Sequence, residues 1–211
     1  MEAGTLSVDW NGYEPYVPGT AEPPHALQRA EARRMYKECM ESKPMRLQML
    51  GRLLKSNGVE QTTDDPAVQN LNNWFIANVE ADSDMPGRLI PIWYSVCHDV
   101  ALFLGDLMIE RQPNLRWEFY TWGKTNVAFQ RHVIMGFSTE DPKLHTNLDI
   151  DRMVVAYAHQ IIEAQGSFPT FGTVEVRGTP IDVDAVAASH RSREIDTEAF
   201  RHWLQRAAER A

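Results

Sequence analysis

The sequence predicts an α+β fold: a mainly helical body of about five or six helices, with a small antiparallel β-hairpin or three-stranded sheet packed on a central helix. Residues 91–112 form a long apolar stretch with helical periodicity. Residues 115–122 and 129–137 alternate as two strands do, and the segments on both sides each carry one apolar helical stripe. Helices grouped around a hairpin are typical of this fold class.

The composition is that of an ordinary globular protein. Of the 211 residues, 43% are hydrophobic and 24% are charged, and the formal net charge is −8. An acidic chain offers no basic surface to phosphate backbones or anionic lipid, so we expect no nucleic-acid partner. The N-terminus lacks the features of a signal peptide, and Asp99 and Asp106 interrupt the most apolar stretch. The sequence therefore predicts a soluble, cytoplasmic protein without a membrane span.

Three parts are predicted along the chain. Residues 1–24 are rich in proline and glycine, which exclude a helix or a central strand, so they form an extended N-terminal arm. Residues 25–166 form the helical α+β domain. Residues 167–211 form a C-terminal appendage, with a short third strand at 173–177 and a final helix that has Asp196 as its N-cap.

Prolines and capping residues predict where the helices begin. One helix starts at Pro24, and a second has Pro44 in its first turn. A third has Asp65 as its N-cap, and Pro91 opens the central helix. A further amphipathic helix covers residues 150–162, where apolar side chains recur with helical spacing.

The hairpin is predicted to have one core face and one outer face. The core face carries Leu115, Trp117, Phe119, Val133, Met135 and Phe137. The outer face carries Glu118, Tyr120, Trp122, Gln130, His132 and Ile134. Large aromatic residues on a solvated face are typical of interfaces. The predicted protein-binding residues are Tyr120, Trp122 and His132, with Trp10 and Tyr13 from the arm. The alternative is that another element of the same chain covers them.

Two cysteines, Cys39 and Cys97, lie on the apolar stripes of different helices. We expect both to be buried, reduced thiols that behave as small hydrophobic groups, and two distant cysteines do not make a zinc ribbon or finger. A catalytic thiol is the alternative. It is disfavoured because His98 directly follows Cys97, and adjacent helical residues do not face each other.

Acidic and histidine side chains of the central helix are the candidates for metal or acid–base chemistry. Asp99 and Asp106 are seven residues apart and share one helical face, and His98 precedes them. A hydrolytic metal site needs ligands from several elements, and the other candidates show no ligand spacing to each other: His132, His145, His159, Asp149 and Asp151. Phosphate-loop, dinucleotide and serine-hydrolase motifs are absent from the sequence. We therefore predict no metal and no cofactor.

The sequence favours a non-catalytic protein-binding module, such as an immunity-type inhibitor, an adaptor or an accessory subunit of a bacterial assembly. The alternative is a metal-dependent or acid–base hydrolase that uses His98, Asp99 and Asp106. Placement of His132 or His159 beside Asp99 in a cleft would favour the hydrolase, and placement on separate faces would disfavour it. The partner is predicted to be a protein, and the sequence gives no oligomeric state.

Overall fold

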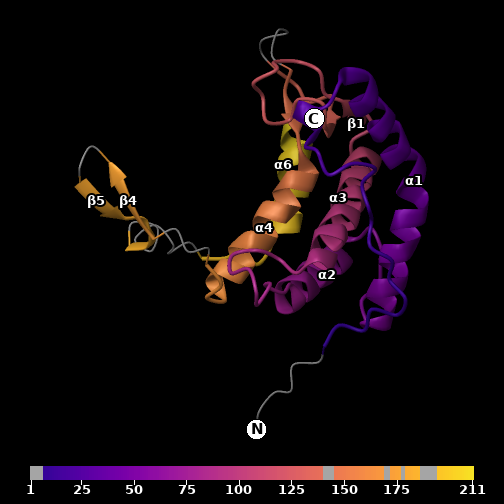
Figure 1. Cartoon of the computed structure of the whole chain (residues 1–211). Coiled ribbons are helices and arrows are strands. Elements are labelled where there is room, and N and C mark those ends of the chain that lie inside the picture. Colours follow the sequence, from indigo (N-terminus) through magenta and orange to yellow (C-terminus); the bar gives the residue numbers. More distant parts are fainter. Residues whose placement is uncertain (1–6, 140–144, 169–171, 177–178, 186–193) are drawn as a thin grey trace.

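The computed structural model describes residues 7–139, 145–168, 172–176, 179–185 and 194–211 (Figure 1). Its elements, in chain order, are η1 (Pro24–Ala26), α1 (Arg29–Ser56), α2 (Asp65–Asn78), α3 (Pro91–Arg111), β1 (Arg116–Phe119), β2 (His132–Met135), β3 (Asn147–Leu148), α4 (Ile150–Ala164), β4 (Thr173–Val176), β5 (Thr179–Asp182) and α6 (Ala199–Arg210). A three-stranded antiparallel sheet packs against a helical body, which confirms the predicted α+β class.

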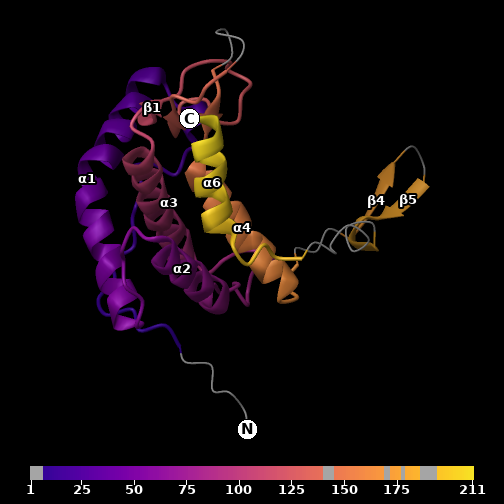
Figure 2. The same cartoon turned by 180° about the vertical axis from the view of Figure 1, so that it is seen from behind.

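Helix α3 is the centre of the body. Helices α1, α4 and α6 pack against it, and α2 packs on α6 (Figures 1 and 2). By length and composition α3 could cross a membrane, but 78% of its apolar window is buried inside the protein. Burial by other helices removes its apolar surface from water, so α3 is the core helix of a compact, soluble-like fold.

Helix α1 runs unbroken for 28 residues, with Pro44 inside it. The predicted start of a second helix at Pro44 is therefore wrong. Proline in a helix interior removes one hydrogen bond and disfavours the helix by about 3 kcal/mol. Cys39, Arg46 and Leu50 are buried on both sides of the proline. Their packing on one face explains why tertiary contacts override the local signal.

The sheet register places His132 toward the helices. Strands β1 and β2 are antiparallel, with Trp117 opposite Ile134 and Phe119 opposite His132. Directly opposed residues share one face of a sheet. Ile134 and Trp117 belong to the main core cluster, which includes α3, so His132 lies on the same inner face.

The predicted faces of the second strand were wrong by one residue. Val133 and Met135 pack with Tyr120 in a separate cluster on the other face of the sheet. Ile134 packs in the main core on the inner face. Both faces of β2 are therefore apolar, so alternation alone does not tell which face meets the helices.

The third strand of this sheet is β3, which pairs with β2. The strand predicted at 173–177 exists as β4, but it pairs with β5 in a second, two-stranded sheet. That hairpin lies away from the helical body in both orientations of the cartoon (Figures 1 and 2).

Helix α6 belongs to the helical body and not to the predicted appendage 167–211. Phe200, Trp203 and Leu204 are buried in the main core, against α2 and α3. Asp196 does not cap α6 as predicted, because the helix begins at Ala199. Its carboxylate instead accepts a hydrogen bond from the backbone N–H of Glu198 at 3.1 Å.

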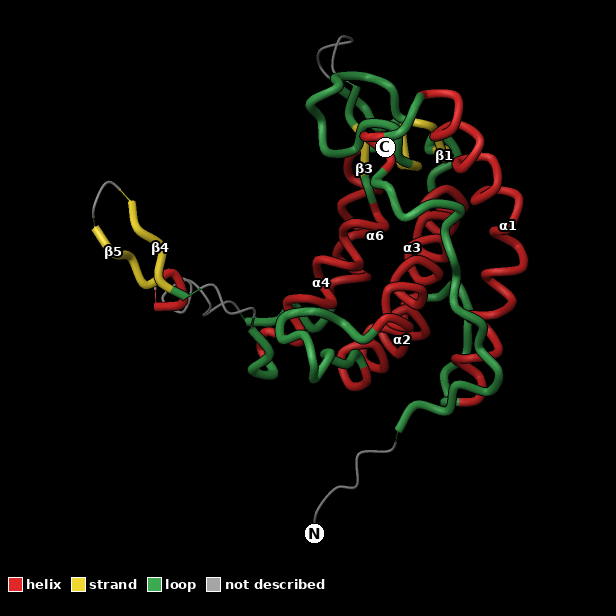
Figure 3. The backbone as a smooth tube through the Cα atoms, in the orientation of Figure 1, coloured by secondary structure: helices red, strands yellow, loops and turns green. Residues whose placement is uncertain are grey.

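The described part of the N-terminal arm lies along the body beside α1 and α3 (Figure 3). Tyr13 is buried, and the Trp10 ring lies 5.8 Å from that of Trp93. The side chain of Asn57 donates a hydrogen bond to the carbonyl of Asp9 at 2.9 Å. These contacts fasten the arm from the end of α1 to the start of α3.

Close approach of the sheet to α3 requires a glycine at position 105. A Cβ atom there would overlap the Trp117 ring. We expect Gly105→Ala to destabilise the protein by about 1–3 kcal/mol in urea denaturation, because overpacking outweighs the better helix propensity of alanine. Gly51→Ala is the matched helical control, since its Cβ would meet only the flexible side chain of Gln61. Equal effects of the two substitutions would contradict this packing.

Candidate active site

A pocket of about 200 Å³ lies where the arm crosses α1 and α3. Four reactive side chains line it, each from a different element: Cys39 from α1, His98 from α3, His132 from β2 and Asp151 from α4. Exposed arm residues, including Glu22, form part of its rim. The pocket therefore brings together reactive groups that are far apart in sequence.

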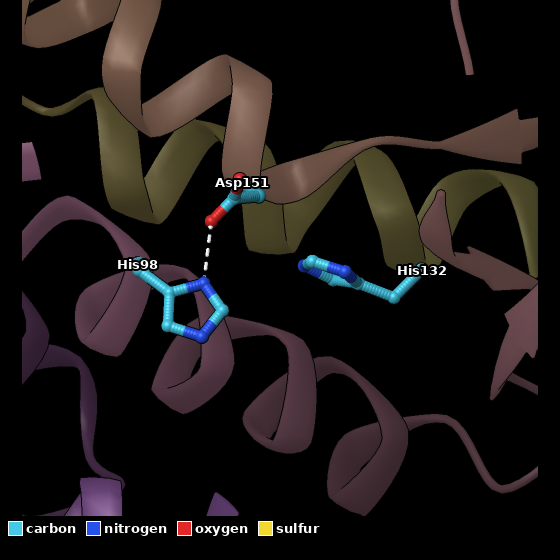
Figure 4. A group of neighbouring side chains, drawn as sticks. All are labelled: His98, His132 and Asp151. Carbon is cyan, nitrogen blue, oxygen red and sulfur yellow. Dashed lines mark hydrogen bonds and ion pairs between the residues drawn. The ribbon is translucent and has the colours of Figure 1, made fainter. Parts of the chain in front are cut away.

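His98 connects a thiol to a carboxylate. Its Nδ1 lies 2.9 Å from Oδ1 of Asp151 (Figure 4), and its Nε2 lies 3.8 Å from Sγ of Cys39. The Tyr16 ring stacks on the imidazole, with the ring centroids 4.3 Å apart. Both ring nitrogens and one ring face are thus engaged, which fixes the orientation of the imidazole.

Arg131 holds Asp151 in place. Its Nη2 donates to Oδ2 of Asp151 at 3.1 Å, and its Nε donates to Oδ2 of Asp149 at 2.6 Å. Asp149 also accepts a hydrogen bond from the backbone N–H of Arg152 and so caps α4. Because Arg131 occupies one oxygen of Asp151, the other is left for His98.

His132 faces the His98–Asp151 pair, with its ring nitrogens directed toward it (Figure 4). One ligand atom of each of the three residues lies within 4.8 Å of the other two. Nε2 of His132 is buried and has no hydrogen-bond partner within the described part of the chain. Buried polar atoms normally have partners, so this nitrogen is available to a group that enters the pocket.

The two histidines of the pocket differ in pKa. Burial alone would lower the pKa of His98, but the hydrogen bond and charge of Asp151 and the contact with Cys39 raise it to about 10. Burial lowers the pKa of His132 to about 4. Burial would raise the pKa of Asp151, but His98 and Arg131 hold it well below its usual range. At neutral pH the pocket holds an imidazolium–carboxylate pair beside a neutral imidazole.

Asp99 and Asp106, predicted with His98, do not reach the pocket. Asp99 is fully buried and pairs with Arg46, and Asp106 pairs with Lys43. Successive helical residues point about 100° apart, so Asp99 faces away from the side that His98 presents. The carboxylate that pairs with His98 is instead that of Asp151, and His132 lies near both residues.

The predicted protein-binding residues do not form one exposed patch. Tyr13 is buried beside Asp99, and Tyr120 is only 4% exposed, so the expected exposure of Tyr120 is wrong. Trp10 packs on Trp93, and His132 lines the pocket. Trp122 stays half-buried and stacks on His145, with centroids 4.2 Å apart. Other elements of the chain cover most of this set, as the sequence alternative proposed.

Both cysteines are buried and unbridged, as predicted. Cys97 does not line the pocket, and burial raises the pKa of its thiol. Cys39 lines the pocket and contacts His98. Comparison with known protein families, curated proteins and solved structures finds no match to this chain. The function of the contact between Cys39 and His98 is therefore inferred from the geometry of the pocket.

Proposed function

We propose that the protein is a hydrolase that cleaves a small ester, thioester or amide with Cys39 as nucleophile. The observation that supports this most is the continuous contact from Cys39 Sγ through both nitrogens of His98 to Asp151. A nucleophile beside a base, with the base oriented by a carboxylate, recurs in hydrolases of unrelated folds. The small pocket volume favours a small substrate.

Each residue has a distinct role in this reaction. The Cys39 thiolate attacks the carbonyl carbon, a C–S bond forms, and the bond to the leaving group breaks as His98 gives it a proton. A water molecule then attacks the thioester and gives its proton to His98, which releases the acid and the free thiolate. The unpaired Nε2 of His132, in the tautomer that carries hydrogen there, donates to the carbonyl oxygen as negative charge develops.

The surroundings of Cys39 support a reactive thiol. A thiolate is the nucleophilic form, and a neighbouring imidazolium stabilises it. His98 supplies that positive charge at 3.8 Å, and its bond to Asp151 keeps the imidazolium protonated. Cys97 differs from Cys39 because its helical position places it in the main hydrophobic core.

Selective alkylation tests the thiol. We expect iodoacetamide to modify Cys39 in the native protein and to leave Cys97 unmodified, because only Cys39 lines the pocket. The sites are read by peptide mass spectrometry. His98→Ala is expected to slow the modification of Cys39 at least about tenfold, since the thiolate loses its counter-charge. The exposed His145 provides the control substitution, His145→Ala.

Hydrolysis of a panel of small nitrophenyl esters and acyl thioesters tests the reaction itself. Wild type is expected to show activity that Cys39→Ala removes and that a chelator does not lower. Activity that survives Cys39→Ala but disappears with chelator would identify a metal-dependent hydrolase instead. Equal modification of both cysteines only after unfolding, with no hydrolysis, would exclude the thiol proposal.

A protein partner and a cytoplasmic location remain predictions. Two free thiols support a reducing compartment, where cysteines stay unbridged. Trp122, half-buried on the outer side of the sheet, is the member of the predicted interface set that a partner could still reach.

A further inference from the structure

We propose that His98, His132 and Asp151 also form a site for a divalent transition-metal ion of the zinc class. The three side chains come from α3, β2 and α4, and converge on one point inside the pocket (Figure 4). Such convergence of side chains from separate elements is typical of metal sites in proteins. The spacing of these residues along the chain did not reveal it.

The donor set selects the kind of metal. Two imidazoles and one carboxylate, with a fourth position open to water, are typical of catalytic zinc sites. Magnesium and calcium prefer oxygen ligands and bind imidazole poorly. The pocket beside these residues provides room for the fourth ligand. The shared chemistry is therefore that of a first-row divalent ion, for which Zn²⁺ is the probe.

The unpaired nitrogen of His132 is a second, independent indication. Nε2 of His132 is buried and has no partner among the residues that the structure describes. A metal ion would use the lone pair of this nitrogen in the other tautomer. A supporting group behind one ligand is also in place, because Arg131 binds Oδ2 of Asp151 and so holds Oδ1 on the side of His98, where the metal would bind.

Small side-chain movements complete the coordination geometry. Zinc–ligand distances of about 2.0–2.1 Å in a tetrahedron place the ligand atoms about 3.3 Å apart. Nδ1 of His98 and Oδ1 of Asp151 are 2.9 Å apart, so a metal that replaces their shared proton separates them slightly. The atoms that are up to 4.8 Å apart need to approach by about 1.5 Å, which rotation of His132 about its side-chain bonds can supply.

Metal and thiol chemistry exclude each other in this pocket. A metal ion bound to Nδ1 of His98 takes the place of the contact with Asp151, so it breaks the line of contacts from Cys39 through His98 to Asp151. The metal-loaded protein is therefore the form with an inactive thiol. This regulatory consequence rests on the proposed function, whereas metal binding itself does not.

Equilibrium dialysis of the full chain against Zn²⁺, with elemental analysis, tests the site. We expect one zinc per chain, which His132→Ala and Asp151→Asn weaken by more than about 100-fold, since even outer-shell partners contribute 10–100-fold. His202→Ala is the matched control, because His202 is also hydrogen-bonded to an aspartate, Asp196, but on the surface. No zinc binding, or binding lost in His202→Ala and kept in His132→Ala, would overturn the proposal.

A measurement on the wild-type protein tests zinc binding without relying on the folding of any variant. Histidine ring nitrogens, observed by NMR, are expected to shift for two of the seven histidines when zinc is added. Shifts at neither His98 nor His132 would contradict the site whatever the variants do.

Alkylation of Cys39 separates the two proposals. Slower alkylation in zinc for wild type, but not for His132→Ala, supports both the metal site and its control of the thiol. Zinc binding that depends on His132, with Cys39 unreactive in all forms, keeps the metal site and removes the thiol hydrolase. Alkylation of Cys39 at the same rate with and without bound zinc would show that the metal does not inactivate the thiol.

Discussion

Replacing Arg46 by alanine is expected to destabilise the folded protein by about 3–5 kcal/mol, the range for breaking a buried ion pair from one side. Arg46 donates from Nε to Oδ1 of Asp99 at 2.8 Å and from Nη2 to Oδ2 at 2.6 Å. Asp99 is fully buried in α3. Without the guanidinium, its carboxylate becomes a buried and largely uncompensated charge.

The same substitution is expected to loosen the N-terminal arm. Nη1 of Arg46 donates to the carbonyl of Glu14 at 2.8 Å, and Nη2 donates to the hydroxyl of Tyr13 at 2.9 Å. Both acceptors belong to the arm that borders the pocket. Limited proteolysis of Arg46→Ala should therefore cut the arm faster than in wild type, and urea denaturation followed by tryptophan fluorescence gives the loss of stability.

A double variant separates the charge from the packing. Arg46→Met with Asp99→Leu replaces both ions by apolar side chains of similar size, and such exchanges are often neutral or stabilising. We expect the double variant to recover much of the loss. A loss below about 1 kcal/mol for Arg46→Ala alone would show that Asp99 is not held as a buried ion.

Local patterns were sufficient to predict most helices. In α3 and α4 the apolar residues recur with helical spacing, and the observed bounds of both helices differ from the predicted ones by a few residues at most. The helix start predicted at Pro44 was wrong because proline disfavours a helix locally, whereas the burial that offsets this cost comes from contacts between α1 and α3. The predicted face of β2 was wrong because both of its faces carry apolar side chains, Ile134 on one and Val133 and Met135 on the other.

The site could be predicted only in part, because it depends on contacts that are distant in sequence. His98 was a candidate, but Cys39 and Asp151, which contact its ring nitrogens, lie 59 and 53 positions away. Nothing in a single sequence sets the rotation of α1 against α3 that brings Cys39 to His98. His132 was predicted on the outer face of the hairpin, but the observed pairing of β1 and β2 places it on the inner face, where it lines the pocket.

Trp93→Ala is expected to destabilise the protein by about 3–5 kcal/mol, the usual effect of removing a buried aromatic ring from a core. Trp93 has no exposed surface, and its ring lies 5.5 Å from Trp74 and 5.7 Å from Phe75, at the junction of α2, α3 and the arm.

Two further substitutions make this prediction specific to core packing. Trp93→Phe should lose less than Trp93→Ala, because the ring is largely kept and the indole N–H has no hydrogen-bond partner in the described structure. Trp122→Ala, at a half-buried surface position, should cost only about 1 kcal/mol. Calorimetric melting compares the three variants. An unchanged melting temperature for Trp93→Ala would contradict the packing of α2 and the arm on α3 around this side chain.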